Sequence, residues 1–281
     1  MHCTTELVYG KLPAVRLRAP DGAEATITLY GAHVVSWIDA SGREQLFMSR
    51  QSALDGSKAL RGGVPVIFPQ FAEQGSGIRH GFARISHWRV LGDGLEDGAA
   101  FVDLVLTPDD LDAKARASWP HAAQLRLRVA VRARELHLSL HVTNCGADAF
   151  SFASALHSYH RVSALADVRI GGLQGLAYAE SGAAPRLQED AILSLPEKTD
   201  RIYQEVAAPI TLRDADGTRE LTHQGFHNAV VWNPGAADCA ALADMADDEY
   251  TAFVCIEPAL IGGHLLPPGA SWHGSHTIRA A

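Results

Sequence analysis

A strict two-residue alternation of apolar and polar side chains between residues 124 and 143 constrains the fold more than any other feature of the sequence. Leucine or valine occupies positions 125, 127, 129 and 131, and then positions 136, 138, 140 and 142. Successive side chains of a strand point to opposite faces of the sheet, so each run predicts a strand with one apolar face. The break Ala133-Arg134-Glu135 joins the two runs into an antiparallel hairpin, which ends at the turn sequence Asn144-Cys145-Gly146.

Further short apolar runs, separated by turn residues, recur along the chain. With 25 glycines and 13 prolines, the chain has few stretches with the 3.6-residue period of a helix. A single helical turn is expected within residues 108–117, closed by Pro120. Many short strands with turns between them predict an antiparallel β-sandwich or barrel, and no linker or repeat divides residues 1–281 into more than one all-β domain. The other predicted strands are 25–30, 33–37, 64–68, 100–106, 168–170 and 252–256.

The composition excludes several classes of protein. The chain has 24 Lys and Arg against 32 Asp and Glu, a formal net charge of −8, whereas a general nucleic-acid binder needs a basic surface. No apolar run approaches the roughly 20 residues that cross a bilayer, and the first residues lack the basic and apolar regions of a secretory signal. The cysteines Cys3, Cys145, Cys239 and Cys255 are far apart and are expected to be reduced thiols. We therefore expect a cytoplasmic protein that binds neither nucleic acid nor a membrane.

Two patterns that often mark cofactor sites do not fit this chain. The glycines of Gly75–Gly81 have the wrong spacing for a dinucleotide-binding loop, and no strand-to-helix unit surrounds them. His157 and His160 lie three residues apart, and on a strand such residues point to opposite faces and cannot share one metal ion without a bulge. Neither a nucleotide cofactor nor a metal is expected.

A local reversal of charge marks the segment between residues 61 and 89. Arg61, Arg79, Arg84 and Arg89 lie there with Glu73 as the one acidic residue, a net charge of +3 in a chain of −8. Guanidinium groups pair with the oxygens of phosphate or carboxylate in a two-pronged geometry, so the segment suggests an anion pocket. From charge alone, solvated surface arginines are an equal alternative.

Glu257 follows an apolar run and precedes Pro258. This position predicts a carboxyl group at the end of a strand, half removed from water. Partial burial raises the pKa of a carboxyl group towards values suited to a catalytic base. An exposed side chain at a strand end is the alternative.

Several strings, in this order along the chain, resemble those of the hexose-6-phosphate mutarotases, also called glucose-6-phosphate 1-epimerases. The resemblance spans about residues 31 to 269. The strings that carry it best are Arg61-Gly-Gly-Val-Pro-Val-Ile-Phe-Pro69, Arg79-His-Gly-Phe-Ala-Arg84, Ala155-Leu-His-Ser-Tyr159, Thr199-Asp-Arg-Ile-Tyr203 and Glu257-Pro258.

The resemblance implies a galactose-mutarotase-like antiparallel β-supersandwich and a set of site residues. His157 matches the family's catalytic histidine and Glu257 its catalytic glutamate. Arg61 and Arg84 match the phosphate-binding arginines, and Arg79 stands at a binding position that is often glutamine in the family. The implied substrate is a hexose 6-phosphate, with no cofactor and no metal.

Four further positions complete the comparison with the family. His80 and Asp200 match polar positions expected to contact sugar hydroxyls. Gln70 stands where many bacterial relatives have tryptophan, and His160 stands where an aromatic or aliphatic residue is usual. These two departures would affect the choice of sugar, not the chemistry.

The implied chemistry is opening and closure of the sugar ring by one acid and one base. Glu257 would remove the O1 proton while a protonated His157 donates to the ring oxygen, so His157 is expected to be charged near neutrality, supported by nearby carboxylates. Three alternatives remain: an aldose 1-epimerase acting on unphosphorylated sugars, a non-catalytic sugar-phosphate-binding module, and a histidine-bound metalloenzyme on a cupin-like barrel. A monomer is expected, although no feature of the sequence fixes the oligomeric state.

Overall fold

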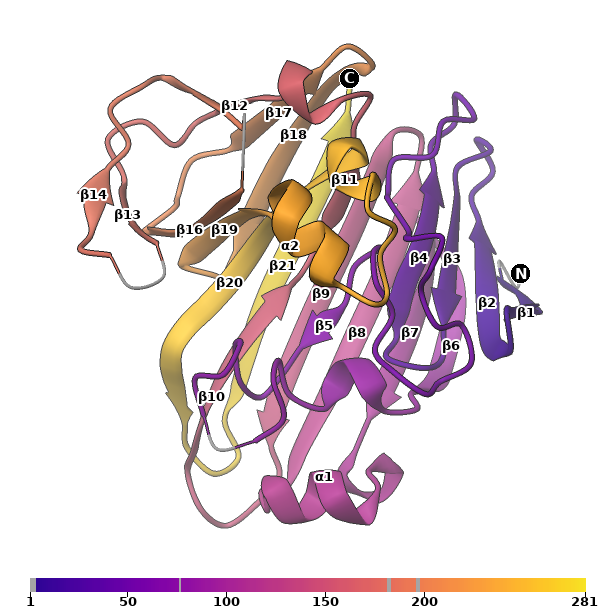
Figure 1. The fold of residues 1–281 in the computed structure, drawn as a ribbon. Coiled ribbons are helices and arrows are strands. Elements are labelled where there is room, and N and C mark those ends of the chain that lie inside the picture. The colour runs from indigo at the N-terminus through magenta and orange to yellow at the C-terminus, as the bar shows by residue number, and fades with distance from the viewer. Residues whose placement is uncertain (1–3, 76, 181–182, 196–197) are drawn as a thin grey trace.

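The computed structural model describes residues 4–75, 77–180, 183–195 and 198–281 (Figure 1). Strands dominate it, and every pairing between the strands named here is antiparallel. A four-stranded sheet contains β1 Thr4–Tyr9, β2 Leu12–Arg18, β3 Glu24–Thr28 and β4 His33–Ile38. An eight-stranded sheet contains β5 Val66–Ile67, β10 Phe150–Leu156, β11 Tyr159–Arg161, β13 Ala177–Glu180, β14 Arg186–Leu187, β16 Thr199–Gln204, β19 Asn228–Asn233 and β20 Phe253–Leu266.

The largest sheet lies behind the eight-stranded sheet in the view of Figure 1. Within the described residues its nine strands are β6 Arg89–Glu96, β7 Ala99–Leu106, β8 Ala123–Arg132, β9 Glu135–Asn144, β12 Arg169–Gly171, β15 Ile192–Ser194, β17 Ile210–Asp214, β18 Gly217–Gln224 and β21 Ser271–Ala280. The helical segments are short: α1 Ala113–Ser118, α2 Gly235–Ala241, and the 3-10 turns η1 Ala83–Ile85, η2 Pro108–Asp110, η3 Leu165–Asp167 and η4 Glu249–Ala252. No helix in the described ranges is long and apolar enough to span a membrane.

The hairpin predicted from the alternation is confirmed. β8 and β9 pair without a register break from Ala123 opposite Asn144 to Arg132 opposite Glu135. The turn is the dipeptide Ala133-Arg134, and Ala133 takes the left-handed conformation (φ +46°) that lets a two-residue turn follow the twist of the strands. Glu135, expected in the turn, is already the first residue of β9.

The apolar face of this hairpin forms part of a core shared by all three sheets. Leu127 of β8 and Leu140 of β9 are fully buried in one cluster with Leu17 of β2 and Ile256 of β20. Burial of one leucine side chain contributes about 2 kcal/mol, so the alternation that sets the strands also supplies the energy that holds the sheets together.

Several predicted strands differ at their ends from the observed ones. The run 64–68 is reduced to β5 Val66–Ile67, because Pro65 and Pro69 flank it and have no N–H to donate to a ladder. Val168 belongs not to a strand but to the end of η3, where its N–H donates to the Leu165 carbonyl at 3.1 Å. The helical turn expected within 108–117 is present as η2 and α1.

The run 252–256 shows the largest difference, because it does not stop before Pro258. β20 extends from Phe253 to Leu266, with β11 pairing its first part and β10 its second. The Ile256 N–H donates to the Ser158 carbonyl at 3.2 Å, and Pro258, two residues on, faces the same side of the strand. On that side, Pro258 lies between the last residue of β20 that pairs with β11, Cys255, and the first that pairs with β10, Ala259. The missing N–H of the proline therefore interrupts neither ladder.

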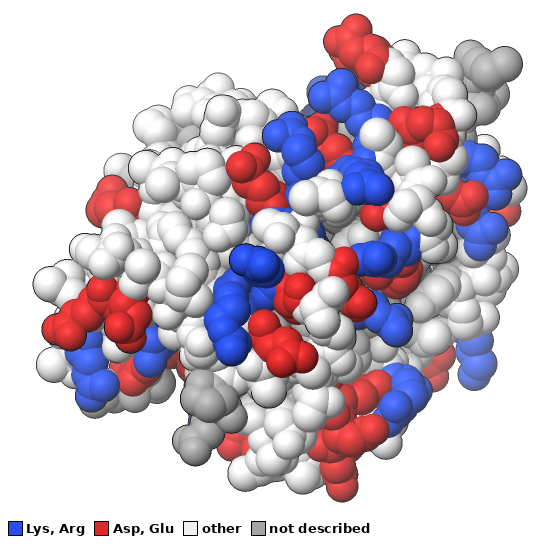
Figure 2. All heavy atoms as spheres, turned by 90° about the horizontal axis from the view of Figure 1, so that it is seen from above, with Lys and Arg blue, Asp and Glu red and all other residues white. Residues whose placement is uncertain are grey.

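The face of the molecule seen from above carries acidic and basic side chains side by side, without a large patch of either sign (Figure 2). Of the four cysteines, Cys145 is exposed and Cys239 and Cys255 are buried, and all three are free thiols. Cys3 lies outside the described residues, as does Ser76 of the string Gly75–Gly81.

Candidate active site

An open pocket on the eight-stranded sheet collects every site residue that the sequence predicted. Its cavity volume is about 360 Å³, within the range of small-molecule sites. Its wall combines charged, imidazole and apolar side chains. The lining residues are Arg61, Phe71, Ala72, Arg79, His80, Arg84, His157, Asp200, Val230, Trp232, Leu242 and Glu257.

The two side chains proposed for proton transfer lie in contact. Nδ1 of His157 is 3.3 Å from Oε1 of Glu257, although the residues are 100 positions apart. Glu257 lies within β20, and His157 lies in the break between β10 and β11, the two strands that pair along the same side of β20. The break is held by the His157 N–H, which donates to the Pro65 carbonyl at 3.0 Å. The interrupted strand therefore turns the imidazole towards the carboxyl group.

The environment of Glu257 differs from the one expected. Glu257 is the fifth residue of a fourteen-residue strand, not a strand end, and it is only 1% exposed. Burial, followed by the charge of Asp200, holds the pKa of the Glu257 carboxyl well above its usual range. The predicted direction of the pKa shift is confirmed, and its main cause is complete burial of the carboxyl group, not the partial burial expected at a strand end.

The expectation that His157 is charged near neutrality is wrong for the surroundings that the fold gives it. Burial holds the pKa of His157 well below its usual range, and the charges of His80, Arg61 and Arg84 lower it further. The pKa of Glu257, the carboxyl expected to support the imidazolium, is itself shifted in the direction that favours the neutral form. Both shifts favour the neutral pair, in which the transferable proton is on the carboxyl group.

Arg61 is held by partners on both sides. Its Nε and Nη2 donate to the two carboxylate oxygens of Asp244 at 3.2 and 3.1 Å, and its Nη1 donates to the Tyr159 hydroxyl at 3.0 Å. Tyr159 and Asp244 raise the pKa of Arg61 above its already high value. The guanidinium is therefore permanently charged and fixed in direction.

Arg84 lacks such partners. Its Nη2 donates to the Arg79 carbonyl at 2.9 Å, whereas its buried Nε has no hydrogen-bond partner within the part of the chain described here. Burial lowers the pKa of Arg84 to about 10, and Arg61 and Arg79 contribute to the shift. A half-buried guanidinium with a free donor, beside two further arginines, has the chemistry that suits an anion.

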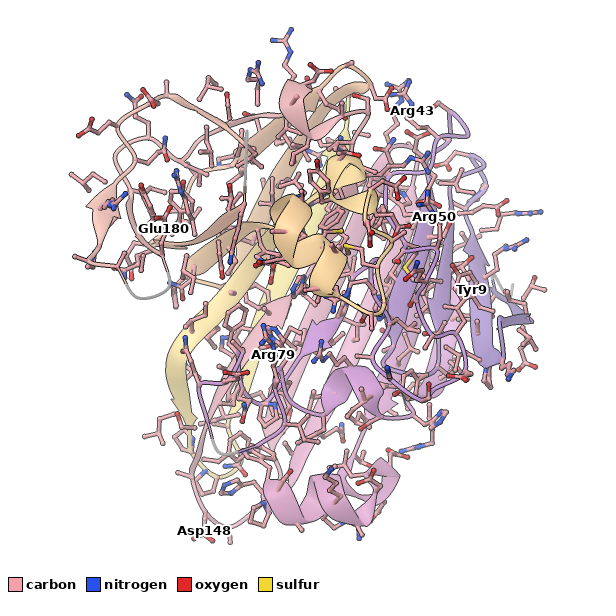
Figure 3. All side chains as sticks on the ribbon, in the orientation of Figure 1. Tyr9, Arg43, Arg50, Arg79, Asp148 and Glu180 are labelled. Atoms are coloured by element: carbon pink, nitrogen blue, oxygen red, sulfur yellow. The ribbon has the colours of Figure 1, made fainter. Side chains whose placement is uncertain are left out.

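The other two arginines of the basic segment are exposed. Arg79 lies below α2 in the orientation of Figure 1, at the rim of the pocket, and its Nη1 is 3.3 Å from Oε1 of Glu73 (Figure 3). Arg89 is not among the pocket residues and forms a two-pronged ion pair with Asp110 at 2.7 and 3.1 Å. The charge count of the segment is therefore only partly a property of the pocket, which contains three of its four arginines.

His80 is a neutral hydrogen-bond donor to the pocket. The Ala72 N–H donates to its Nδ1 at 3.1 Å, so the ring hydrogen is on Nε2. Burial lowers the pKa of His80 to about 3, and Arg84, Arg79 and Arg61 add to the effect. Its ring lies 5.7 Å from that of His157, centroid to centroid.

Asp200 faces the pocket from β16, in register with Trp232 of β19. Burial raises the pKa of the Asp200 carboxyl, and the charges of Lys198 and Arg79 oppose the shift. Asp200 supplies a carboxyl group near Glu257, the arrangement expected for a group that accepts hydrogen bonds from sugar hydroxyls.

Neither departure from the family pattern lies in the lining of this pocket. Gln70 braces the loop that leads to Arg79: its amide donates to the Ala72 carbonyl at 3.1 Å and its oxygen accepts from the Gly77 N–H at 2.8 Å. His160 is fully buried, with Nε2 3.4 Å from the Ile256 carbonyl. His157 lines the pocket and His160 does not.

Sequence reasoning assigned no role to three residues that shape the site. Tyr159 stacks on the His157 ring at 4.9 Å with an angle of 10° between the planes, and Trp232 meets that ring edge-on at 6.0 Å. Asp244 orients Arg61 from 183 positions away. Tyr159 occurs in a string that resembles the family, but no local pattern points to Asp244.

Comparisons with known proteins agree with this architecture. A family model described as aldose 1-epimerase matches residues 13–279. A protein of Cenchrus ciliaris named "Putative glucose-6-phosphate 1-epimerase" is 35% identical over 283 residues, covering 96% of this chain and 85% of that protein. The crystal structure of "a putative mutarotase" from Salmonella typhimurium superposes with a TM-score of 0.89 at 29% identity, covering 99% of this chain and 94% of that one. A galactose mutarotase-like protein of Clostridium acetobutylicum superposes with a TM-score of 0.76 at 17% identity, over 100% of this chain and 98% of that one.

The fold is that of the galactose mutarotase-like proteins, which confirms the antiparallel supersandwich expected from the sequence. Within that class, the chain belongs to the aldose 1-epimerase family. Membership of this family implies that the substrate is a small sugar.

Proposed function

We propose that this protein is a glucose-6-phosphate 1-epimerase, which interconverts the α and β anomers of hexose 6-phosphates. The observation that carries the proposal is one pocket in which an imidazole–carboxyl contact and three arginines face the same space. The first feature suits proton transfer at the anomeric carbon and the second suits a phosphate group. The names of the relatives point to the same activity.

Ring opening needs one group to accept a proton and one to donate a proton. The carboxylate of Glu257 removes the proton from O1 while the imidazolium of His157 donates to O5. The C1–O5 bond breaks as the C1–O1 bond becomes a carbonyl. Rotation about C1–C2 presents the other face of the aldehyde, and closure returns both protons. Each positioned acid or base contributes roughly 10²–10⁴-fold.

The protonation of the empty pair fits this scheme once the substrate is bound. The neutral carboxyl–imidazole pair and the carboxylate–imidazolium pair contain the same number of protons and differ only in the position of one of them. Arg61 and Arg84 are among the charges that lower the pKa of His157. A phosphate dianion beside them offsets those charges, so it favours transfer of the shared proton to His157 across the 3.3 Å contact.

An aldose 1-epimerase acting on unphosphorylated sugars would use the same pair. The buried, unpartnered Nε of Arg84 favours the phosphorylated substrate, because a charged donor removed from water is stabilised by an anion and not by a neutral sugar. A non-catalytic binding module would need the arginines but would not need the contact between His157 and Glu257.

Measurement of anomer exchange by NMR on glucose 6-phosphate and on glucose tests the proposal. We expect the protein to accelerate anomer exchange of glucose 6-phosphate at a far lower protein concentration than it needs for anomer exchange of glucose. Arg84→Met should reduce kcat/KM for glucose 6-phosphate by at least roughly 10-fold, the value of one lost charged hydrogen bond, and should leave glucose nearly unaffected. Equal losses on the two sugars would show that Arg84 does not bind phosphate.

A further inference from the structure

Three residues with metal-binding side chains lie together at the pocket. They are His157, Cys255 and Glu257, and their nearest donor atoms (one imidazole nitrogen, the thiol sulfur and one carboxyl oxygen) all lie within 4.8 Å of one another. Cys255 and Glu257 are two residues apart on β20 and so share one face of the strand. His157 approaches that face from the break between β10 and β11.

The donor atoms of this cluster are available. Neither Nδ1 of His157 nor Oε2 of Glu257 has a hydrogen-bond partner among the described residues, and the two residues are 8% and 1% exposed. Cys255 is fully buried and is a free thiol. Buried polar atoms usually have partners, so two side chains with unpartnered atoms, clustered with a buried sulfur, point to a ligand.

We propose that His157, Cys255 and Glu257 form a binding site for Zn²⁺. Imidazole, thiolate and carboxylate are the ligands that zinc prefers, whereas Mg²⁺ and Ca²⁺ take oxygen ligands. In a tetrahedral zinc site the ligand atoms lie roughly 3–4 Å apart, so the cluster closes on the ion by rotation of side chains. His157 and Glu257 line the pocket, which leaves the fourth position open towards it.

Because the pocket is positively charged, its affinity for Zn²⁺ depends on the thiol of Cys255. Arg61, Arg79 and Arg84 repel a free dication. A thiolate and a carboxylate together balance the two charges of the ion, and the complex then adds no net charge beside the arginines. Removal of the sulfur leaves one uncompensated positive charge, so Zn²⁺ should bind far more weakly without Cys255.

The site has a consequence for catalysis that rests on the proposed function. Zn²⁺ would occupy the imidazole and the carboxyl that exchange protons with the sugar. The ion and the hexose 6-phosphate therefore exclude each other, and Zn²⁺ acts as an inhibitor that a chelator removes.

The test uses Co²⁺ as a spectroscopic probe for the site on metal-free full-length protein. We expect one equivalent of Co²⁺ to bind with a sulfur-to-cobalt charge-transfer band and to be displaced by Zn²⁺, with no effect of Mg²⁺. Cys255→Ser should lose the band and bind Zn²⁺ at least 10-fold more weakly. Cys239→Ser is the matched control, because Cys239 is also buried and free but lies outside the cluster, and it should keep both properties.

Absence of the band in the wild-type protein, or its survival in Cys255→Ser, overturns the proposal. If Cys255→Ser does not fold by circular dichroism, X-ray absorption of the zinc-loaded wild-type protein decides, and a zinc shell without sulfur overturns the proposal. These readouts need no turnover. Inhibition of anomer exchange is measured separately, and for each variant it is reported as the Zn²⁺ concentration that halves that variant's own rate. If the protein binds the metal but has no epimerase activity, the proposed function is rejected and the metal site is still supported.

Discussion

Replacement of Arg84 by methionine should stabilise the empty protein while weakening its hold on phosphate. Burial and two neighbouring arginines lower the pKa of Arg84 from its usual high value to about 10. One pKa unit corresponds to about 1.4 kcal/mol, so holding this charge in the folded state costs at most about 3.5 kcal/mol, and solvent at the exposed part of the side chain reduces that value. Loss of the bond from Nη2 to the Arg79 carbonyl offsets about 1 kcal/mol.

The expected net gain is about 2 kcal/mol, or a rise in Tm of several degrees for a chain of this size. Thermal and urea denaturation of Arg84→Met and the wild-type protein measure it, with and without hexose 6-phosphate. The ligand should raise the Tm of the wild-type protein more than that of the variant, because only the wild-type binds it tightly.

Two matched variants show whether the change in stability is specific to Arg84. Arg61→Met should destabilise the protein, because it leaves Asp244 and the Tyr159 hydroxyl without their partner. Arg79→Met should change stability by less than about 0.5 kcal/mol, because Arg79 is exposed. The reasoning would be refuted if Arg84→Met were less stable than the wild type without ligand. It would also be refuted if hexose 6-phosphate raised the Tm of the variant as much as that of the wild type.

Three further predictions concern stability and the loop at the pocket. Burial lowers the pKa of His33 to about 4, so the unfolded chain binds its proton first, and His33 alone should contribute up to about 3 kcal/mol to a fall in the free energy of unfolding between pH 6.5 and 4; a flat pH dependence in urea denaturation would contradict this. Leu140→Ala empties a fully buried position and should cost about 2–5 kcal/mol of unfolding free energy by the same method, and a loss below 1 kcal/mol would show that the site is not packed as described. Gln70→Ala frees the loop bearing Arg79, so KM for hexose 6-phosphate should rise with little change in kcat, and steady-state kinetics with an unchanged KM would exclude this positioning role.

The sequence identified the elements whose signals are local. Alternation alone predicted the hairpin of β8 and β9 almost to the residue, because its apolar face is buried along its whole length. Its failures came where local signals and tertiary structure disagree. Pro258 predicted the end of a strand, yet β20 passes through it because the proline faces a break in the neighbouring ladder.

For the candidate site, too, the sequence predicted the residues but not the properties that depend on tertiary structure. The resemblance supplied seven of the twelve residues that line the pocket, but it did not supply their environments. Arg89 has the same charge as Arg84 and is close in sequence, yet it pairs with Asp110 outside the pocket. The neutral state of His157 depends on burial and on arginines that only the fold brings near, and no spacing in the sequence reports either.

The central claim is that His157 and Glu257 exchange protons with one sugar ring. The most direct test is two-dimensional exchange NMR of glucose 6-phosphate with the wild-type protein, His157→Asn and Glu257→Gln, at equal concentrations of folded protein. The account predicts fast α–β exchange with the wild type and a rate lower by roughly 10²–10⁴-fold with each variant. Exchange by either variant within a few-fold of the wild-type rate would contradict it.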